Sequence, residues 1–536
     1  MSSAVDTLAA PPASRPILER KSSLSTRMVF LVLLVVGIGY TGYSLVSDIS
    51  GANTRAATIL PYFLLGVALL IALGFEFVNG FHDTANAVAT VIYTHALPPH
   101  VAVVYSGTLN FIGVLFSSGA VAFGIISLLP VELILQVGSG AGFSMVFALL
   151  IAAILWNLGT WWLGLPASSS HTMIGSIIGV GVANALMHGR DGTSGVDWAQ
   201  ATKIGYSLLL SPLVGFVCAA LLLLLLKVLV KNRALYQEPR GNASPPWWIR
   251  GILILTCGGV SFAHGSNDGQ KGMGLIMLIL IGTVPIAYAL NRAMPVQQMA
   301  PFIQIAGATQ QAVQQAAPGP VPADARQVLS TYVRTHAWNE EVLPALGSIA
   351  GSIGEQVQAS GSFAQIPGER VTNVRNDMYL TSEAIRSYTK DPHAKALSEA
   401  TRKELDGFKK QVDGATKFIP LWVKVAVAIA LGLGTMVGWK RIVVTIGEKI
   451  GKTHLTYAQG ACAELVAMAT IAAADAFGLP VSTTHVLSSG VAGTMAANRS
   501  GLQLTTLRNL AVAWVLTLPA AILLSGSLYW LFRQIF

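Results

Sequence analysis

Apolar stretches long enough to cross a lipid bilayer recur along nearly the whole of this 536-residue chain. A membrane-spanning helix needs about 20 predominantly apolar residues, because it has to cross a hydrocarbon layer about 30 Å thick. The sequence is 53% hydrophobic and only 11% charged, whereas a soluble domain carries about 25% charged residues. The sequence therefore predicts an all-α, polytopic membrane protein with about 11–12 transmembrane helices, and the lipid bilayer is its first expected partner.

The expected helices cover most of the chain outside one central segment. Read from hydropathy, they span 28–47, 58–95, 101–128, 143–163, 166–187, 203–227, 251–290, 421–438, 457–476, 479–495 and 505–535. Two of these stretches are too long for one crossing, and each contains a polar motif. We therefore expect 58–95 and 251–290 to be broken or re-entrant helices near the middle of the membrane.

The chain divides into parts that differ in polarity. Residues 1–27 are polar and contain several prolines, and we expect them to form a disordered cytoplasmic tail before an extra N-terminal membrane helix at 28–47. No small-residue cleavage site follows this helix, so we interpret it as an uncleaved membrane helix and not as a signal peptide. Residues 292–418 mix charges of both signs and lack a membrane-length apolar run. They are expected to form a water-exposed, periplasmic helical insert.

Basic residues predict the orientation, because Lys and Arg are enriched in cytoplasmic loops. The short loops that follow 203–227, 421–438 and 479–495 are flanked by such residues. If these loops and the N-terminus are cytoplasmic, the expected crossings alternate without conflict, and 292–418 falls on the other side. The net charge of +9 is explained in this way, and no nucleic-acid partner is expected.

One polar motif occurs twice in the chain. Residues 80–87 read GFHDTANA and residues 265–272 read GSNDGQKG, so the first glycine and the aspartate coincide. In this alignment Asn86 corresponds to Lys271. A polar motif in one apolar helix would be weak evidence, whereas its repetition in a second long helix indicates a common plan for two halves of the chain.

A second motif is also duplicated. LPASSSH begins at Leu165 and LPVSTTH begins at Leu479. In the orientation derived from the charges, the two copies of each motif start from opposite faces of the membrane. The sequence thus predicts two inverted repeats, 58–231 and 251–290 with 421–535, as in many secondary transporters, which bind substrate near the midplane where the repeats meet.

The serine- and threonine-rich motifs place hydroxyl groups at the start of helices. A helix N-terminus presents free N–H groups and a partial positive charge, so added hydroxyls complete a cradle for an anion. Two facing cradles suit a tetrahedral oxyanion. Helix capping is the alternative, but it does not account for three hydroxyls in a row in both motifs. The candidate anion-binding residues are Ser168, Ser169, Ser170, Thr172, Ser482, Thr483, Thr484 and Lys271.

Carboxylates at membrane depth are costly unless they are paired or bind a cation. We therefore interpret Asp83 and Asp268 as a site for a coupling cation or a proton; the alternative is that they hold a broken helix together. Lys271 either pairs with Asp268 or faces the anion, and the sequence leaves this choice open. The candidate coupling residues are Asp83, Asn86, Asn267, Asp268, His82, His264 and Glu464. His171 and His485 are candidates to touch a metal carried with the anion.

Together these motifs resemble the signature of the inorganic phosphate transporter family, PiT. The resemblance rests on GFHDTANAVAT, HGSNDGQKG, LPASSSH and LPVSTTH, and it covers roughly 58–290 and 421–535. It implies symport of inorganic phosphate with a cation by alternating access. The usual family signature is Gly-Ala-Asn-Asp-Val-Ala-Asn-Ala. Here His82 replaces the first-block Asn, and Gln270-Lys271-Gly272 replaces the second-block Ala-Asn-Ala.

The departure at Lys271 bears on the coupling ion. In sodium-coupled members the Asp and Asn residues of both blocks help to ligate sodium, whereas a lysine ammonium is only a donor. The sequence therefore resembles the bacterial, proton-coupled, low-affinity branch of the family, found in the inner membrane. This resemblance implies that phosphate travels with a divalent metal such as Mg²⁺, with H⁺ as the coupling ion and no bound cofactor. It also implies that Asp83, Asp268 and the motif histidines carry the protons.

Several alternatives stay open at this point. Sodium could drive the transport, and sulfate could replace phosphate, because hydroxyls and amides do not by themselves separate the two anions. From another class, SSSH suggests an intramembrane hydrolase with Ser170 as nucleophile and His171 as base, although adjacent residues rarely face each other on a helix. We expect a transporter and not an enzyme. The sequence also leaves open whether the chain forms a homodimer.

Overall fold

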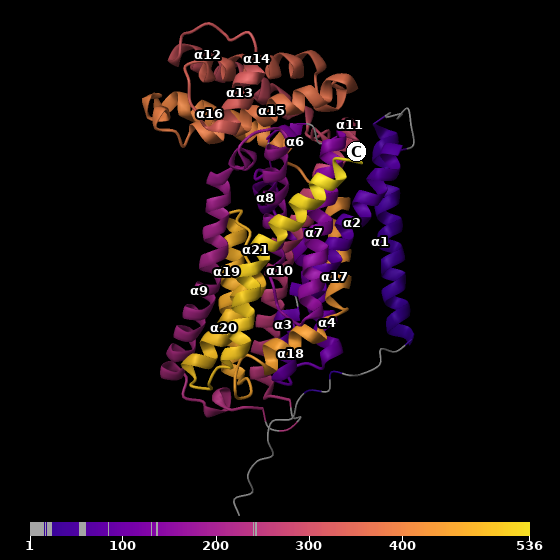
Figure 1. Cartoon of the computed structure of the whole chain (residues 1–536), viewed down its shortest axis with the longest axis vertical. Coiled ribbons are helices and arrows are strands. Elements are labelled where there is room, and N and C mark those ends of the chain that lie inside the picture. Colours follow the sequence, from indigo (N-terminus) through magenta and orange to yellow (C-terminus); the bar gives the residue numbers. More distant parts are fainter. Residues whose placement is uncertain are drawn as a thin grey trace, which may run out of the picture.

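The computed structural model describes residues 16, 18, 24–52, 60–83, 85–129, 131–135, 138–239, 241 and 244–535, except for the side chains of residues 25, 26, 85, 86, 395 and 396. The described residues form helices and connecting loops, and their only β pairing is a single bridge between Gly451 and Leu502. The expected tail 1–27 lies largely outside the described residues. The all-α fold predicted from the sequence is confirmed (Figure 1).

The first half of the chain forms helices α1 to α9. Their bounds are α1 (Leu24–Gly51), α2 (Leu60–Asp83), α3 (Ala85–Tyr93), α4 (Pro99–Phe116), α5 (Ala120–Ile126), α6 (Val131–Leu135), α7 (Gly140–Trp162), α8 (Ser169–Met187) and α9 (Trp198–Leu229). The second half begins with α10 (Trp247–Thr283) and α11 (Pro285–Tyr288). After an insert it continues with α17 (Leu421–Thr435), α18 (Lys440–Glu448), α19 (Tyr457–Ala476), α20 (Thr483–Ala497) and α21 (Leu504–Phe532).

Among the described residues, eight helices are long and apolar enough to cross a membrane, or up to nine if a bent pair counts as one span. This is fewer than the expected total of about 11–12. One reason is that the stretch 101–128 is not one helix: α4 ends at Phe116, and α5 begins after Gly119, whose φ of 87° interrupts the helical backbone. Another is that α20 contains only 15 residues.

The expected break in the second long helix is absent, which corrects that prediction. α10 runs without interruption for 37 residues through the second polar motif. The helix tolerates the charge of Asp268 because partners lie one turn away on either side: Lys271 Nζ lies 2.5 Å from Asp268 Oδ2, and His264 Nε2 lies 3.4 Å from it. In the first half, α2 ends at Asp83 and α3 begins at Ala85, and Thr84 between them lies outside the described residues.

Small residues let helices of the two halves approach until their backbones touch. A Cβ added at Gly80 would lie 2.2 Å from the carbonyl oxygen of Leu431 on α17, and one added at Gly265 would lie 2.2 Å from that of Asn110 on α4. Gly80 and Gly265 are the aligned first residues of the duplicated motif. A side chain at either position would force the helices apart. α2 therefore packs on α17, and α10 packs on α4, through equivalent glycines.

The helices that follow the serine-rich motifs are also exchanged between the halves. α8 of the first half packs on α21 of the second, and α20 of the second half packs on α9 of the first. A Cβ added at Gly179 would lie 2.2 Å from the carbonyl oxygen of Ile522, and one at Gly493 would lie 2.1 Å from that of Phe216. The two halves are therefore interlocked by reciprocal contacts.

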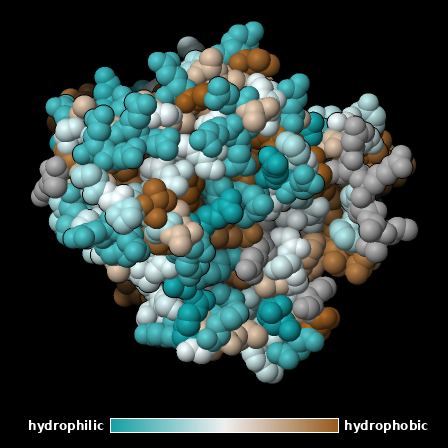
Figure 2. All heavy atoms as spheres, turned by 90° about the horizontal axis from the view of Figure 1, so that it is seen from above, coloured by the Kyte–Doolittle hydropathy of each residue, from teal (hydrophilic) through white to brown (hydrophobic). Residues whose placement is uncertain are grey.

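The segment between α11 and α17 forms a separate helical bundle at one end of the molecule (Figure 1). Its helices are α12 (Met299–Ala316), α13 (Ala325–Thr335), α14 (Val342–Ser360), α15 (Gly368–Tyr388) and α16 (Glu399–Thr416). Side chains such as Phe302, Leu346 and Phe408 are buried in its core. Viewed from this end, the surface is dominated by hydrophilic residues (Figure 2), in contrast to the apolar side chains that α1 and α9 expose.

Ion pairs attach the insert to the loops of the helical body. Asp197, the N-cap of α9, lies 2.9 Å from Arg386 Nη2 on α15 and 3.8 Å from His336 Nε2. Burial alone would raise the pKa of Asp197, but the nearby His336 imidazole and the hydrogen bonds from the backbone of Gln200 and from Arg386 outweigh it and hold that pKa well below its usual range. Asp197 therefore stays ionised at every physiological pH and remains a partner for Arg386.

Candidate anion and cation site

The two serine- and threonine-rich motifs begin α8 and α20 with the same local structure. Ser168 is the N-cap of α8, and its Oγ accepts a hydrogen bond from the backbone N–H of His171 at 3.2 Å. Ser482 caps α20 in the same way, accepting from the N–H of His485 at 3.1 Å. The first hydroxyl of each motif is thus engaged in helix capping, which leaves the following hydroxyls for other roles.

These following hydroxyls form contacts within and between the halves. Asn157 of α7 donates to Ser169 Oγ at 3.0 Å, and its Oδ1 lies 3.0 Å from Thr172 Oγ1. Ser170 Oγ donates to the backbone carbonyl of Val481, 2.6 Å away in the opposite motif. Thr483 Oγ1 is buried with no hydrogen-bond partner among the described residues.

The histidines of the two motifs lie side by side. The ring centres of His171 and His485 are 4.7 Å apart, and His485 also stacks on Trp514 at 4.1 Å. Both rings are oriented by their neighbours, yet His171 Nδ1 and His485 Nε2 are buried without a hydrogen-bond partner among the described residues. Two such nitrogen atoms could accept a proton, or they could face a metal that accompanies an anion.

The aspartates of the two polar blocks meet at the same place. Ligand atoms of Asp83, His264 and Asp268 all lie within 4.8 Å of one another, and all three residues are buried. Asp83 Oδ1 accepts a hydrogen bond from Thr484 Oγ1 at 2.7 Å. This bond joins the cation candidates of the first half to the anion candidates of the second.

Other helices support this cluster with polar side chains that carry no motif. His82 Nδ1 lies 2.9 Å from Asp83 Oδ1, and its Nε2 lies 3.1 Å from Thr160 Oγ1 on α7. His264 Nδ1 lies 2.9 Å from Asn110 Oδ1 on α4. Sequence reasoning missed Thr160 and Asn110, because a single polar residue in an apolar helix has no distinguishing pattern.

Lys271 is fully buried, and in this structure it pairs with Asp268, one of the two roles that the sequence left open. A third carboxylate, that of Glu76, is also fully buried: its Oε2 accepts from Asn79 Nδ2 at 3.3 Å, and its Oε1 has no hydrogen-bond partner among the described residues. Glu76 Oε1 would lie 2.4 Å from a Cβ added at Gly272, the residue after Lys271. Glu76 could have been linked to the cluster from the sequence, because it lies seven residues before Asp83 and therefore on the same face of α2.

Glu464 lies in a different environment. It is buried and accepts short hydrogen bonds from Thr90 of α3 and Thr256 of α10. No contact among the described residues joins it to Asp83 or Asp268. The structure thus separates Glu464 from the aspartate cluster with which the sequence analysis grouped it.

Asn267 ties α10 to the start of α20, and the side chain of Asn86 lies outside the described residues. Asn267 Nδ2 donates to the carbonyl oxygen of Leu479 at 3.1 Å. Beside it, Asp475 of α19 accepts hydrogen bonds from Ser266 Oγ and Gln270 Nε2, each at 2.6 Å. These bonds fix α10 against the loop that carries the second hydroxyl motif.

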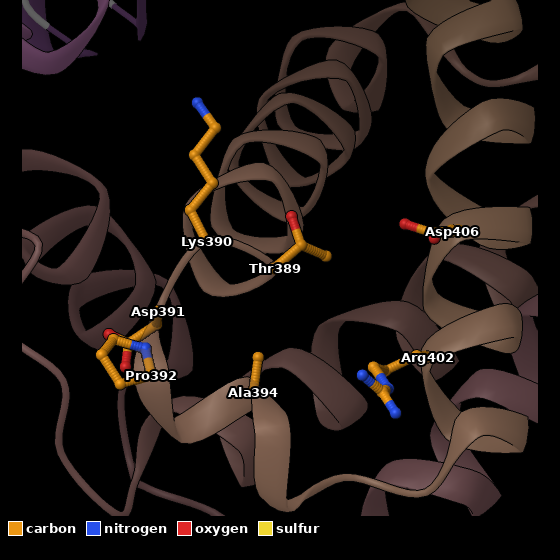
Figure 3. Close-up of a pocket in the computed structure, with 7 residues that line it drawn as sticks. All are labelled: Thr389, Lys390, Asp391, Pro392, Ala394, Arg402 and Asp406. Atoms are coloured by element: carbon orange, nitrogen blue, oxygen red, sulfur yellow. The ribbon is translucent and has the colours of Figure 1, made fainter.

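A surface cavity of about 350 Å³ lies elsewhere, in the insert. Figure 3 shows Arg402 and Asp406 on one helix of this cavity, with Lys390 directed away from Arg402. The cavity is lined by Thr389, Lys390, Asp391, Pro392, Ala394, Arg402 and Asp406. None of these residues belongs to a duplicated motif, so this cavity is separate from the buried cluster.

Comparison with known proteins relates the chain to transporters. A model of the phosphate transporter family matches residues 79–525. The chain is 42% identical to the low-affinity inorganic phosphate transporter PitA of Escherichia coli (strain K12), with 88% of this chain and 97% of the relative covered. It is 28% identical to a probable low-affinity inorganic phosphate transporter of Bacillus subtilis (strain 168), with 87% and 97% covered.

A solved structure described as "The sodium-dependent phosphate transporter" also aligns, at 19% identity and a TM-score of 0.49, covering 88% of this chain and 100% of the other. The matching curated relatives are named as transporters and not as enzymes. Ser170, the residue of the hydrolase alternative, donates its hydroxyl to a backbone carbonyl. The resemblance inferred from the four motifs is confirmed, and the chain belongs to the phosphate transporter family.

Proposed function

We propose that the protein is a symporter that carries inorganic phosphate across the bacterial inner membrane together with protons. One observation carries this proposal: three buried carboxylates and one buried ammonium share one region of the protein, and the hydrogen bond from Thr484 to Asp83 joins this region to the hydroxyl-bearing N-terminus of α20. The carboxylates belong to Glu76, Asp83 and Asp268, and the ammonium belongs to Lys271. A site of this composition can hold positive charge and an oxyanion together.

The balance of charge explains why anion and cation binding would be coupled. With all three carboxylates ionised and Lys271 protonated, the cluster carries an excess of negative charge, which repels phosphate. An ionised group at the centre of a bilayer costs roughly 2.5–3.5 kcal/mol even on insertion scales. Uptake of protons by Glu76, Asp83, His82 or His264 removes the excess, so phosphate binds best after protons have bound, as symport requires.

Protons fit this site better than sodium because of Lys271. Its ammonium lies 2.5 Å from Asp268 Oδ2, where a ligated cation would otherwise lie. In this proposal Glu76, Asp83, Asp268, His82 and His264 exchange the protons, whereas Asn86 and Asn267 position the surrounding helices. Glu464 would serve as a separate proton-binding group between α3, α10 and α19.

Phosphate would bind where the two hydroxyl motifs meet. Ser169, Ser170 and Thr172 of one motif and Thr483 and Thr484 of the other supply hydroxyls, while Ser168 and Ser482 hold the helix starts in place. His171 and His485 could contact a divalent metal such as Mg²⁺ that travels with phosphate as part of the substrate. A hydrogen-bond acceptor such as Asp83 distinguishes protonated phosphate from sulfate, because sulfate has no proton to donate at neutral pH.

We further propose that the two halves are inverted repeats that alternate access to the site. The reciprocal packing of α2 on α17 and α10 on α4, and of α8 on α21 and α20 on α9, supports this relation. The basic loops favour a cytoplasmic N-terminus, with the 292–418 insert in the periplasm. Alternation between the two faces then follows from a rearrangement of helix pairs, each made of one helix from either half, relative to one another.

The test is uptake of labelled phosphate into liposomes that contain the purified protein. An inward proton gradient or an inward sodium gradient is imposed, each with and without magnesium. We expect uptake that follows the proton gradient, ignores sodium and increases with magnesium. Uptake that requires sodium would refute proton coupling, and transport of sulfate without phosphate would refute the substrate.

A further inference from the structure

A second basic site lies outside the buried cluster, where α18 meets the turn between α7 and α8. Figure 1 shows α18 toward the end of the molecule opposite the insert, and a surface pocket of about 320 Å³ lies beside this helix. It is lined by Trp162 at the end of α7, by Leu163 and Gly164 of the turn, and by Lys440, Arg441, Val444 and Lys449 of α18 and its C-terminal end. Nothing in the proposed transport cycle uses these residues.

The basic half of the pocket contains lysines that are not neutralised by an ion pair within the described residues. The side chains of Lys440 and Lys449 are exposed, and they form no ion pair within the described residues. Arg441 Nη1 donates to the carbonyl oxygen of Trp162 at 2.5 Å, and its guanidinium carbon lies 4.6 Å from the centre of the Trp162 ring. The neighbouring carboxylate of Glu448 is held by Tyr93, whose hydroxyl donates to it at 2.7 Å.

The other half of the pocket is apolar and also exposed. Trp162 is 65% exposed and Leu163 is 69% exposed. In contrast, Ile442, Val443 and Ile446 of α18 are buried against the helical body. A helix that buries one face and presents cations on the other, next to an exposed Trp and Leu, has the composition of the membrane–water interface.

We infer that this pocket binds the headgroup of an anionic phospholipid. The cations of Lys440, Arg441 and Lys449 would contact the lipid phosphate, and the chains would lie along Trp162 and Leu163. Free inorganic phosphate offers the same oxyanion to the cations, but it would leave the apolar half of the pocket without a partner. Basic pockets between helices on the cytoplasmic side of membrane proteins bind such headgroups, and the basic loops predict this side to be cytoplasmic.

A bound headgroup bridges α18 to the segment that leads into the first hydroxyl motif. Thr445 Oγ1 of α18 already donates to the carbonyl oxygen of Gly164 at 2.8 Å, and Ser168 follows four residues later. Anionic lipid therefore stabilises one position of the α7–α8 turn. The lipid composition of the membrane can therefore influence the first hydroxyl motif, although the lipid does not contact the transported ion.

The experiment compares the wild type with K440Q/K449Q, and with K452Q as a matched control, because Lys452 is an exposed lysine outside the pocket. Each protein is reconstituted in vesicles of phosphatidylcholine alone and in vesicles that also contain phosphatidylglycerol. Retained phosphatidylglycerol is counted by native mass spectrometry, and phosphate uptake is measured in the same preparations. Loss of two cationic contacts should weaken lipid binding about 30-fold, while K452Q behaves as the wild type.

Each outcome bears on the pocket. Lipid-stimulated uptake in the wild type and K452Q but not in K440Q/K449Q supports the inference, as does the matching loss of retained lipid. Equal lipid retention in all three proteins overturns it. If the double variant instead has a higher KM for phosphate by the same factor in both vesicle types, the pocket holds free phosphate and the lipid assignment is wrong. Because lipid retention is read without transport, absence of uptake by the wild type would refute only the proposed function.

Discussion

Removing the ammonium of Lys271 should destabilise the protein more than removing the whole ion pair that it forms with Asp268. The two charged atoms are 2.5 Å apart and both side chains are fully buried, so at an effective dielectric constant of about 20 their attraction is about 7 kcal/mol. Desolvation of two ions costs several kcal/mol each and offsets most of this gain. K271M loses this attraction, but the ionised carboxylate of Asp268 still pays its desolvation cost. The free energy of unfolding should therefore fall by about 3–5 kcal/mol.

The double variant D268N/K271M has neither charge, and its stability should lie within about 1–2 kcal/mol of the wild type. The assay is the unfolding transition of the purified proteins in the same detergent or nanodisc, with D268N alone completing the cycle. A double variant that is less stable than K271M would refute the electrostatic reasoning.

Three further predictions follow from particular contacts. E76Q keeps the shape of Glu76 but not its proton, so we expect at least about tenfold slower proton-driven uptake with an unchanged melting temperature; uptake at the wild-type rate would exclude Glu76 from coupling. G113A places a Cβ 2.1 Å from a carbonyl oxygen of α10 and should cost about 1–3 kcal/mol in unfolding free energy, whereas G159A, with nothing within 4 Å, should be close to neutral. The depressed pKa of Asp197 adds stability to the folded protein above about pH 4, and this stability is lost only as the pH falls through the lower pKa of the folded state. D197N should therefore loosen the insert at neutral pH, measured as faster limited proteolysis than in the wild type. Equal rates of proteolysis for the two proteins would contradict the role of the Arg386 pair.

The sequence could predict the parts of the site that belong to duplicated motifs. Asp83 and Asp268 were expected to meet because they occupy equivalent positions in duplicated motifs, and their ligand atoms do lie within 4.8 Å of one another and of His264. The role of Thr484 as a donor to Asp83 could not be predicted, because it depends on how a helix of one half is placed against a helix of the other.

Other features escaped prediction because they depend on local compensation. A run of polar residues in an apolar helix suggested a break, but the pairing of Asp268 with Lys271 within α10 satisfies the charge and the helix continues. In the same way, counting hydroxyls could not separate Ser168 and Ser482, which cap helices, from Thr483, which is buried without a partner among the described residues.

The close backbone contacts made by Gly80, Gly265, Gly179 and Gly493 also limit how the molecule can move. Where two helices touch through their backbones, no side chain lies between them that could change its rotamer and let one slide along the other. Each of the pairs α2–α17, α4–α10, α8–α21 and α9–α20 is therefore expected to behave as a rigid body during a conformational change. The displacement that exposes the buried cluster must then occur at the borders between these pairs, where larger side chains and connecting loops can rearrange.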